Sequence, residues 1–244
     1  MRVNKPILVF QHIACEHPGV FRDFLNLDGI EWHAVELDAG EPVPPLADYA
    51  ALWVMGGPMD VWQEAEHPWL SDEKHAIREA VEDRKMPFLG LCLGHQLLAE
   101  ALGGEVGPGK PEIGILPVAR TDAARDSAFL QGFPDSLDVL QWHGAEVKRA
   151  PSAATVLMES PLCGVQAMSV GERAFSVQFH VEMTPTTVSE WSEVPAYANA
   201  LRETLGEHAL ETFDTLTAER MPQFNAAARR IYDNWKAAAL TGKA

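Results

Sequence analysis

Short apolar runs alternate with segments of helical periodicity over the first hundred residues. Apolar runs of strand length fall at residues 7–10, 30–37, 51–55 and 87–91. Hydrophobic residues recur at helical spacing in residues 20–27, 69–84 and 95–102, and Ser71 is the expected N-cap of the second of these helices. Strands that alternate with helices predict a parallel sheet covered by helices on both faces.

Beyond residue 104 the chain changes to consecutive strand patterns, at residues 113–118, 137–142, 155–159, 165–170 and 174–179. Strands that follow one another with turn residues between them predict an antiparallel extension, and the last strand is expected to rejoin the main sheet. From residue 184 onward the pattern is helical, and one face of a terminal helix is formed by Phe224, Ala228, Ile231 and Trp235.

These elements predict a single α/β domain over residues 1–244. Its core, residues 1–183, is expected to hold an open, mostly parallel central sheet with helices on both faces and a small antiparallel extension. Residues 184–244 are expected to form a helical C-terminal extension packed on that core. In open sheets of this kind, sites form at the carboxyl ends of the strands.

Composition narrows the class of protein. The chain has 47% hydrophobic and 22% charged residues, as soluble globular proteins do, and its net charge of -16 argues against nucleic-acid or anionic-membrane partners. No apolar run approaches the 18 or so residues of a membrane helix, and no signal peptide is apparent. Three widely spaced cysteines, without a Cys-x-x-Cys pair, indicate a reducing, cytoplasmic location and no metal site. No cofactor is expected.

Candidate chemistry centres on residues 87–96, where a strand pattern meets Gly-x-Cys-x-Gly and then a helix. The two glycines allow a sharp turn that leaves Cys92 exposed at its apex in a strained conformation. The N-terminus of the following helix favours a thiolate and offers N–H groups to an oxyanion. The alternative is a buried structural thiol, because free cysteine is often buried. A nucleophilic Cys92 is the more economical interpretation.

A cysteine nucleophile needs a base, and the base needs an orienting group. His180 follows the strand at residues 174–179, and Glu182 lies two positions further on, on the same side of extended backbone. The carboxylate is therefore expected to hold the imidazole in one tautomer. His143, at the end of another strand, is a candidate pocket residue, whereas His95 is expected to point away from the thiol. The remaining histidines lack comparable context.

An oxyanion hole needs two N–H donors directed at one point. The amide of Leu93, directly after the nucleophile, is the first candidate. The turn Gly56-Gly57-Pro58 ends the strand before the crossover, and the Gly57 amide can approach a substrate because no Cβ intervenes. The alternative is an ordinary turn at the end of a strand.

Together these residues resemble the class I glutamine amidotransferases of the Cys-His-Glu type. Residues 90–96 match the family's Gly-x-Cys-x-Gly-x-Gln elbow, residues 56–58 its oxyanion strand and residues 180–182 its His-Pro-Glu. Gln11-His12, residues 111–114 and Trp142-His143 further resemble the stand-alone branch similar to the amidotransferase domain of GMP synthetase. The flavodoxin-like fold of that family is accordingly expected here.

The resemblance implies hydrolysis of the glutamine side-chain amide. Cys92 would form a glutamyl thioester, with His180 as acid and base and Glu182 steadying the imidazolium, while the Gly57 and Leu93 amides hold the oxyanion. By the same resemblance the substrate is bound by Gly56, Gln96 and His143. No Gly-rich phosphate-binding motif is present, so the ammonia acceptor would be used by a separate synthetase subunit.

This chain departs from the family pattern at two positions. Val181 replaces the proline between His180 and Glu182, and Ala145 stands where relatives of GMP synthetase often carry an acidic residue.

Two alternatives keep the fold and change the activity. One is a γ-glutamyl peptidase or hydrolase with the same triad, and the other is a catalytically idle binding domain. An α/β-hydrolase would place its acid before its histidine, the reverse of the order here.

Overall fold

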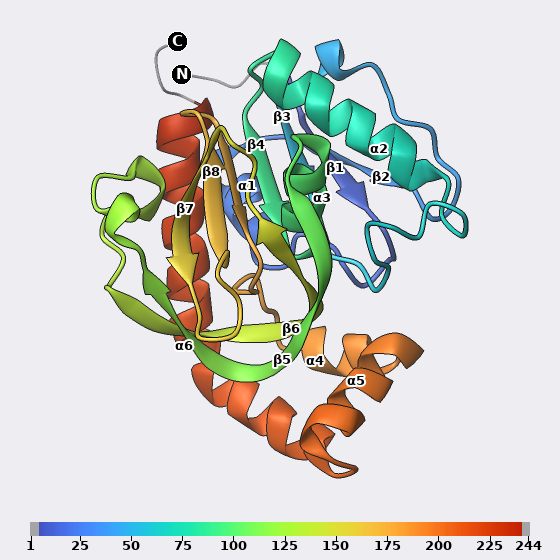
Figure 1. The fold of residues 1–244 in the computed structure, drawn as a ribbon, viewed down its shortest axis with the longest axis vertical. Helices are drawn as coiled ribbons and strands as arrows, with labels where there is room; N and C mark the ends of the chain where they lie inside the picture. The colour runs from blue at the N-terminus through green and yellow to red at the C-terminus, as the bar shows by residue number, and fades with distance from the viewer. Residues whose placement is uncertain (1–4, 241–244) are drawn as a thin grey trace.

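The computed structural model describes residues 5–240, so the predicted domain limits at 1 and 244 lie outside the described residues. Figure 1 shows a sheet with helices on both sides. The strands are β1 Ile7–Gln11, β2 Trp32–Glu36, β3 Ala51–Val54, β4 Phe88–Leu91, β5 Glu105–Arg120, β6 Ser136–Arg149, β7 Ala154–Glu159, β8 Ala167–Val170 and β9 Ala174–Val177. The α-helices are α1 Phe21–Asp28, α2 Trp69–Arg78, α3 Leu93–Ala101, α4 Thr187–Ser192, α5 Pro195–Leu205 and α6 Ala209–Trp235.

The sheet has nine strands in the order β2-β1-β3-β4-β9-β8-β7-β5-β6. The pairs β1–β2, β1–β3, β3–β4 and β4–β9 are parallel, and the pairs from β9 through β8, β7 and β5 to β6 are antiparallel. The predicted fold class is confirmed, including the return of the last strand to the parallel sheet beside β4. The antiparallel extension is larger than the sequence indicated.

Two strands account for that difference. β5 and β6 span 16 and 14 residues, whereas the apolar pattern marked only 113–118 and 137–142. Residues 107–111 of β5 are rich in glycine and proline, which usually indicates a loop. Pairing with β6 overrides that local preference, and a register shift between Pro108 and Glu112 accommodates the prolines, which lack an N–H.

The helix boundaries also differ from expectation at one point. Ser71 lies inside α2, whose N-cap is Pro68, and no side chain caps the helix. The prediction of Ser71 as N-cap was therefore wrong. A proline just before the first turn can serve there because the first N–H groups of a helix have no intrahelical partner.

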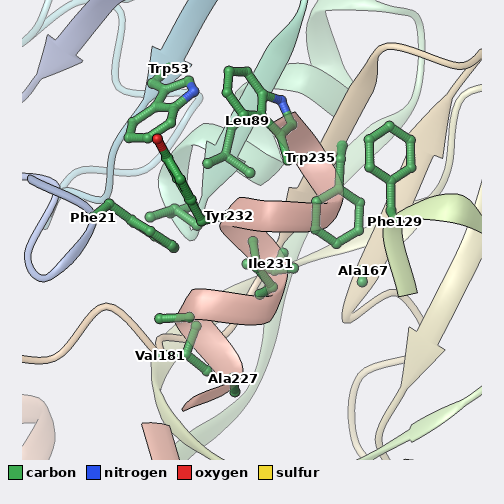
Figure 2. Close-up of a cluster of buried hydrophobic side chains, with 14 of the residues drawn as sticks. Phe21, Trp53, Leu89, Phe129, Ala167, Val181, Ala227, Ile231, Tyr232 and Trp235 are labelled. Carbon is green, nitrogen blue, oxygen red and sulfur yellow. The ribbon is translucent and has the colours of Figure 1, made fainter. Parts of the chain in front are cut away.

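One face of the sheet is covered by α1 and by the C-terminal half of α6. Figure 2 shows Trp235 and Tyr232 of α6 among Phe21 of α1, Trp53 of β3 and Leu89 of β4. In addition to these apolar contacts, the indole N–H of Trp235 donates a hydrogen bond to the Phe88 carbonyl of β4 at 2.9 Å. The end of the helical extension thus belongs to the main core, where loss of a buried tryptophan typically costs about 3–5 kcal/mol.

α2 and α3 cover the opposite face of the sheet with a second apolar cluster, in which Ile77 and Leu97 are fully buried. A third cluster joins α4, α5 and the first half of α6 to the antiparallel strands, where Trp142 of β6 contacts Trp191 and Phe213. In Figure 1 these helices lie beneath β5 and β6. We call α4, α5 and residues 209–221 the helical cap.

Candidate active site

The turn between β4 and α3 holds Cys92 in a strained conformation. Cys92 has φ 51° and ψ -103°, a region that costs a non-glycine residue about 1–3 kcal/mol. The glycines on either side of Cys92, Gly90 and Gly94, are required because a side chain at either position would clash with the backbone. A Cβ on Gly94 would lie 2.1 Å from the carbonyl oxygen of Val54, and one on Gly90 would lie 2.7 Å from the carbonyl oxygen of Gly94. The expected sharp elbow is therefore present. The predicted exposure of Cys92 is wrong, because the surrounding chain buries its side chain, which borders the cavity described below.

His180 and Glu182 lie together just beyond β9, as their spacing predicted. The imidazole Nδ1 is 2.5 Å from Glu182 Oε1, and the backbone N–H of Val181 donates to Glu182 Oε2 at 2.9 Å. Both side chains are buried. The carboxylate thus accepts two hydrogen bonds, one per oxygen, and the valine that replaces proline supplies one of the donors.

The imidazole of His180 interacts electrostatically with both Glu182 and Cys92. Burial lowers the pKa of His180, but the Glu182 carboxylate and a hydrogen bond with the Cys92 side chain more than offset this, and the net pKa is well above its ordinary value of 6.5. Burial raises the pKa of Glu182, but His180 and the Val181 amide hold it below its ordinary 4.5. An imidazolium between a carboxylate and a sulfur is the favoured state.

Two glutamines extend this arrangement. The Gln178 side-chain amide donates to Cys92 Sγ at 3.5 Å, and Gln96 Nε2 donates to Gln178 Oε1 and to the Ala145 carbonyl, each at 3.1 Å. The sequence predicts that Gln96 binds substrate. In the structure its amide nitrogen donates hydrogen bonds to Gln178 and Ala145. Gln178 was missed. The available signal was its position two residues before His180, on the same side of the chain.

Gly57 and Leu93 line the same cavity as Cys92. Within residues 5–240 neither N–H donates a hydrogen bond to another residue. Gly56 lies differently. Its carbonyl accepts a hydrogen bond from His12 Nδ1 at 2.7 Å, and a Cβ on Gly56 would lie 2.5 Å from Glu16 Oε2. The structure does not bring Gly56 into the cavity wall.

The cavity beside the sulfur has a volume of about 180 Å³ and lies between the elbow, the loop after β3, strands β5 and β6, and α5. Predicted residues in its wall are Cys92, Gly57, Leu93, Gln96 and His143. Asp60 and Glu203 also line it, whereas no lysine or arginine does. The wall therefore carries acidic and neutral polar groups.

The acidic residue nearest to His143 in the structure is Glu112, and not Glu146, which is nearer in the sequence. Its Nε2 is 3.3 Å from Glu112 Oε2, across the β5–β6 pair, and its Nδ1 is 3.0 Å from the Ala145 carbonyl. Burial raises the pKa of Glu112, but the neighbouring His143 imidazole and the hydrogen bonds from Ser160 and Gln166 bring the net pKa below its ordinary 4.5. Glu146 instead pairs with Lys148.

Three further residues lie beside the site: His12, which the sequence marked only through the resemblance of Gln11-His12, and Glu16 and Tyr197, which no sequence signal distinguished. The Tyr197 hydroxyl of α5 donates to Glu16 Oε1 at 2.5 Å, and Tyr197 lines the cavity. Burial raises the pKa of Glu16 against the opposing influence of His180 and Tyr197. Their partners lie far away in the sequence, so local patterns did not reveal them.

No group of three or more His, Cys, Asp or Glu side chains within residues 5–240 is arranged to hold a metal ion. Over the same residues, none of the helices combines the length and apolar character that spanning a bilayer requires.

Known proteins resemble this chain over most of its length. The family model of the class I glutamine amidotransferases matches residues 25–191, more than half of the chain. A glutamine amidotransferase-like protein of Salmonella typhimurium is 33% identical over 230 residues, which cover 91% of this chain and 93% of the relative. A subunit of the glutamine-hydrolyzing GMP synthase of Sulfolobus acidocaldarius is 35% identical over 155 residues, 63% of this chain and 78% of that protein.

Two further matches bear on the fold and the chemistry. Gamma-glutamyl peptidase 3 of Arabidopsis thaliana is 24% identical over 213 residues, 83% of each protein. A solved glutamine amidotransferase from Thermotoga maritima superposes with a TM-score of 0.83 at 28% identity, covering 95% of this chain and 97% of that one. A strained cysteine elbow on this sheet, together with relatives matched nearly end to end, leads to one conclusion: the chain is an enzyme of the class I glutamine amidotransferase family and resembles the amidotransferase part of GMP synthases.

Proposed function

We propose that this enzyme hydrolyses the side-chain amide of glutamine through a thioester on Cys92 and releases ammonia for transfer to an acceptor. The observation that carries the proposal is that three side chains form one connected group, of which Cys92 lines the cavity. A cysteine at a strained elbow interacts with the imidazole of His180, and Glu182 holds that imidazole at 2.5 Å. Such a cysteine, base and orienting acid form the machinery of acyl transfer.

In the first half of the reaction the Cys92 thiolate attacks the γ-amide carbon of glutamine. The negative charge moves to the amide oxygen, where the free N–H groups of Gly57 and Leu93 are available to receive it. The imidazolium of His180 gives its proton to the amide nitrogen, the C–N bond breaks and ammonia leaves. A glutamyl thioester on Cys92 and a neutral imidazole remain.

In the second half, His180 accepts a proton from water as the water oxygen attacks the thioester carbon. The same two amides hold the second oxyanion, the C–S bond breaks and glutamate leaves. Cys92 is again a thiolate beside an imidazolium. Glu182 stays ionised throughout and stabilises the imidazolium formed in each cycle.

The size of the cavity supports a small amino-acid substrate. A volume of about 180 Å³ falls below the ~300–1,000 Å³ of pockets for drug-sized ligands. Gln96 and His143 are the proposed substrate-contacting side chains, since both line the wall. Gly56 is retained only as the partner of Gly57 in the turn, because it does not reach the wall.

A specific alternative is a γ-glutamyl peptidase or hydrolase with the same triad. The match to the Arabidopsis gamma-glutamyl peptidase, over 83% of both proteins, favours it, and its acyl-enzyme would be identical. A dipeptide needs more room than glutamine, and the cavity beside Cys92 has a volume of only about 180 Å³. The size of the cavity therefore favours glutamine.

A separate synthetase subunit is the proposed ammonia acceptor, because the Sulfolobus relative is one subunit of such an enzyme. The cytoplasm is the proposed compartment, since Cys15, Cys92 and Cys163 all remain free thiols.

The test is a side-by-side assay of the purified chain with glutamine and with γ-glutamyl dipeptides, following ammonia and glutamate. We expect ammonia from glutamine, and loss of all turnover in Cys92→Ala with an unchanged unfolding midpoint. Turnover of dipeptides without ammonia release from glutamine would favour the peptidase. Residual hydrolysis in Cys92→Ala above about a thousandth of wild type would mean that another group is the nucleophile.

A further inference from the structure

A buried histidine outside the predicted triad contacts the peptide unit that carries the Gly57 N–H. His12 follows β1, and its ring is completely buried. Nδ1 lies 2.7 Å from the Gly56 carbonyl oxygen and Nε2 lies 2.9 Å from Glu73 Oε1, on α2. The ring stacks on Trp69, with centroids 5.4 Å apart and an interplanar angle of 15°.

The hydrogen bonds define the protonation of His12. A carbonyl oxygen only accepts, so Nδ1 must carry a proton, and a second proton lies in the hydrogen bond between Nε2 and Glu73 Oε1. Burial lowers the pKa of His12, but Glu73 and the Gly56 carbonyl reverse this and leave the pKa raised above 6.5. The ring is an imidazolium held between a carboxylate and a peptide carbonyl.

This contact decides which way the Gly57 N–H points. All peptide bonds in residues 5–240 are trans, and in a trans peptide the C=O and N–H vectors are antiparallel. Because His12 holds the Gly56 carbonyl on one side, the Gly57 N–H of the same unit points to the other. Gly57 lies between His12 and Leu93, since a Cβ there would be 2.9 Å from both side chains.

A Gly-Gly peptide needs such a constraint. With no Cβ on either residue, the unit can rotate into the opposite orientation at small steric cost. That rotation would direct the Gly56 carbonyl oxygen toward Cys92 and remove one oxyanion donor. A charge-assisted hydrogen bond is among the stronger hydrogen bonds in proteins, and the one from His12 therefore favours a single orientation.

We propose that His12, held by Glu73, is a positioning residue that keeps the 56–57 peptide turned so that the Gly57 N–H faces the reacting carbonyl. This inference rests on the proposed function. The positive ring also polarises the peptide toward a stronger N–H donor, because linked hydrogen bonds reinforce one another. His12 itself does not line the cavity.

A purely structural role for the pair makes different predictions. Replacing a buried ion pair by apolar groups of similar volume is often neutral for stability, so the pair is weak evidence of a stabilising device. Glu73 Oε2 also has no hydrogen-bond partner within the described residues, which makes the pair costly to bury. The contact with Gly56 explains what the arrangement provides.

The experiment compares His12→Leu with His12→Asn. The asparagine amide nitrogen occupies the position of Nδ1 and can still donate to the Gly56 carbonyl, whereas leucine of similar shape cannot. We expect His12→Leu to lower kcat for L-glutamine about 10²- to 10³-fold, as loss of one oxyanion donor does, with KM within about threefold. The kcat of His12→Asn should be at least about tenfold higher than that of His12→Leu.

Alkylation of Cys92 by iodoacetamide separates orientation from general damage. This displacement creates no oxyanion, so its rate should stay within about twofold of wild type in both variants. The rates are compared well below the unfolding midpoint of each variant, because leucine and asparagine both leave Glu73 without its Nε2 partner. Equal loss of kcat in the two variants, or alkylation slowed in parallel with turnover, would overturn the proposal.

A crystal structure of His12→Leu gives a readout that needs no turnover. We expect the 56–57 peptide to be rotated or present in two orientations, and a peptide retained in the single original orientation would refute the inference. If wild type hydrolyses neither glutamine nor γ-glutamyl peptides, the proposed function fails, while this structural readout still decides the role of His12.

Discussion

Glu182→Gln is the most informative single change, because it removes charge while keeping the size of the side chain. In the structure both carboxylate oxygens are acceptors, one from His180 Nδ1 at 2.5 Å and one from the Val181 N–H at 2.9 Å. A glutamine side chain offers one acceptor and one donor. It therefore satisfies only one of the two neighbours.

Each orientation of the new amide carries a cost. If its oxygen faces His180, its NH₂ group opposes the buried Val181 N–H, and an unsatisfied buried donor costs about 1–3 kcal/mol. If its oxygen faces Val181, the NH₂ group donates to Nδ1, so that the proton of a neutral imidazole sits on Nε2. That tautomer cannot accept a proton from the sulfur side, as in serine-protease triads that lose their acid.

We expect kcat/KM for glutamine to fall about 10²- to 10⁴-fold. The lower figure corresponds to about 2.7 kcal/mol at 1.36 kcal/mol per tenfold in rate, and the upper to full occupation of the wrong tautomer. His180→Ala should cost more, because it removes the proton carrier itself. Steady-state ammonia release by the two purified variants measures both effects.

Two results would refute this reasoning. Retention of more than about a tenth of wild-type kcat/KM by Glu182→Gln would mean that neither orientation of the new amide impairs the imidazole of His180. A larger loss in Glu182→Gln than in His180→Ala would reverse the roles assigned to the two residues.

The same variant has a signature in the pH dependence of stability. The pKa of His180 is raised, so its contribution is complete below the ordinary 6.5 and is lost as pH rises through the higher folded value. The pKa of Glu182 is lowered, so its contribution is present above 4.5 and is lost as pH falls through the folded value. The stability gap between wild type and Glu182→Gln should be widest between pH 4.5 and 6.5. Thermal unfolding across that range measures it.

Two further changes test the surroundings of the site by chemical denaturation. Gly94→Ala should destabilise the fold by at least about 1–3 kcal/mol, because its Cβ would lie 2.1 Å from the Val54 carbonyl oxygen. Gly164→Ala is its control, since a Cβ there meets nothing within 4 Å, and equal midpoints for the two variants would contradict the steric argument. Tyr197→Phe should lower stability by about 1–3 kcal/mol, because the buried Glu16 loses its 2.5 Å donor. An unchanged midpoint would show that this hydrogen bond does not hold the cap.

The sequence by itself determined the features that depend on neighbouring residues. Apolar runs of period and length typical of buried strands located the parallel sheet, because burial on both faces selects such runs. The elbow at Cys92 followed from its two glycines, and the approach of His180 to Glu182 followed from the two-residue period of extended backbone. These are local constraints, and no distant part of the chain alters them.

The tertiary structure alone decided the contacts between distant segments. His12 meets the Gly56 carbonyl 44 positions away, and Tyr197 meets Glu16 across 181 positions. β5 runs through a Gly-Pro-rich stretch because pairing with β6 outweighs its local preference. Partners of this kind are selected by packing and by the need of buried polar groups for hydrogen bonds, neither of which leaves a periodic trace in the chain.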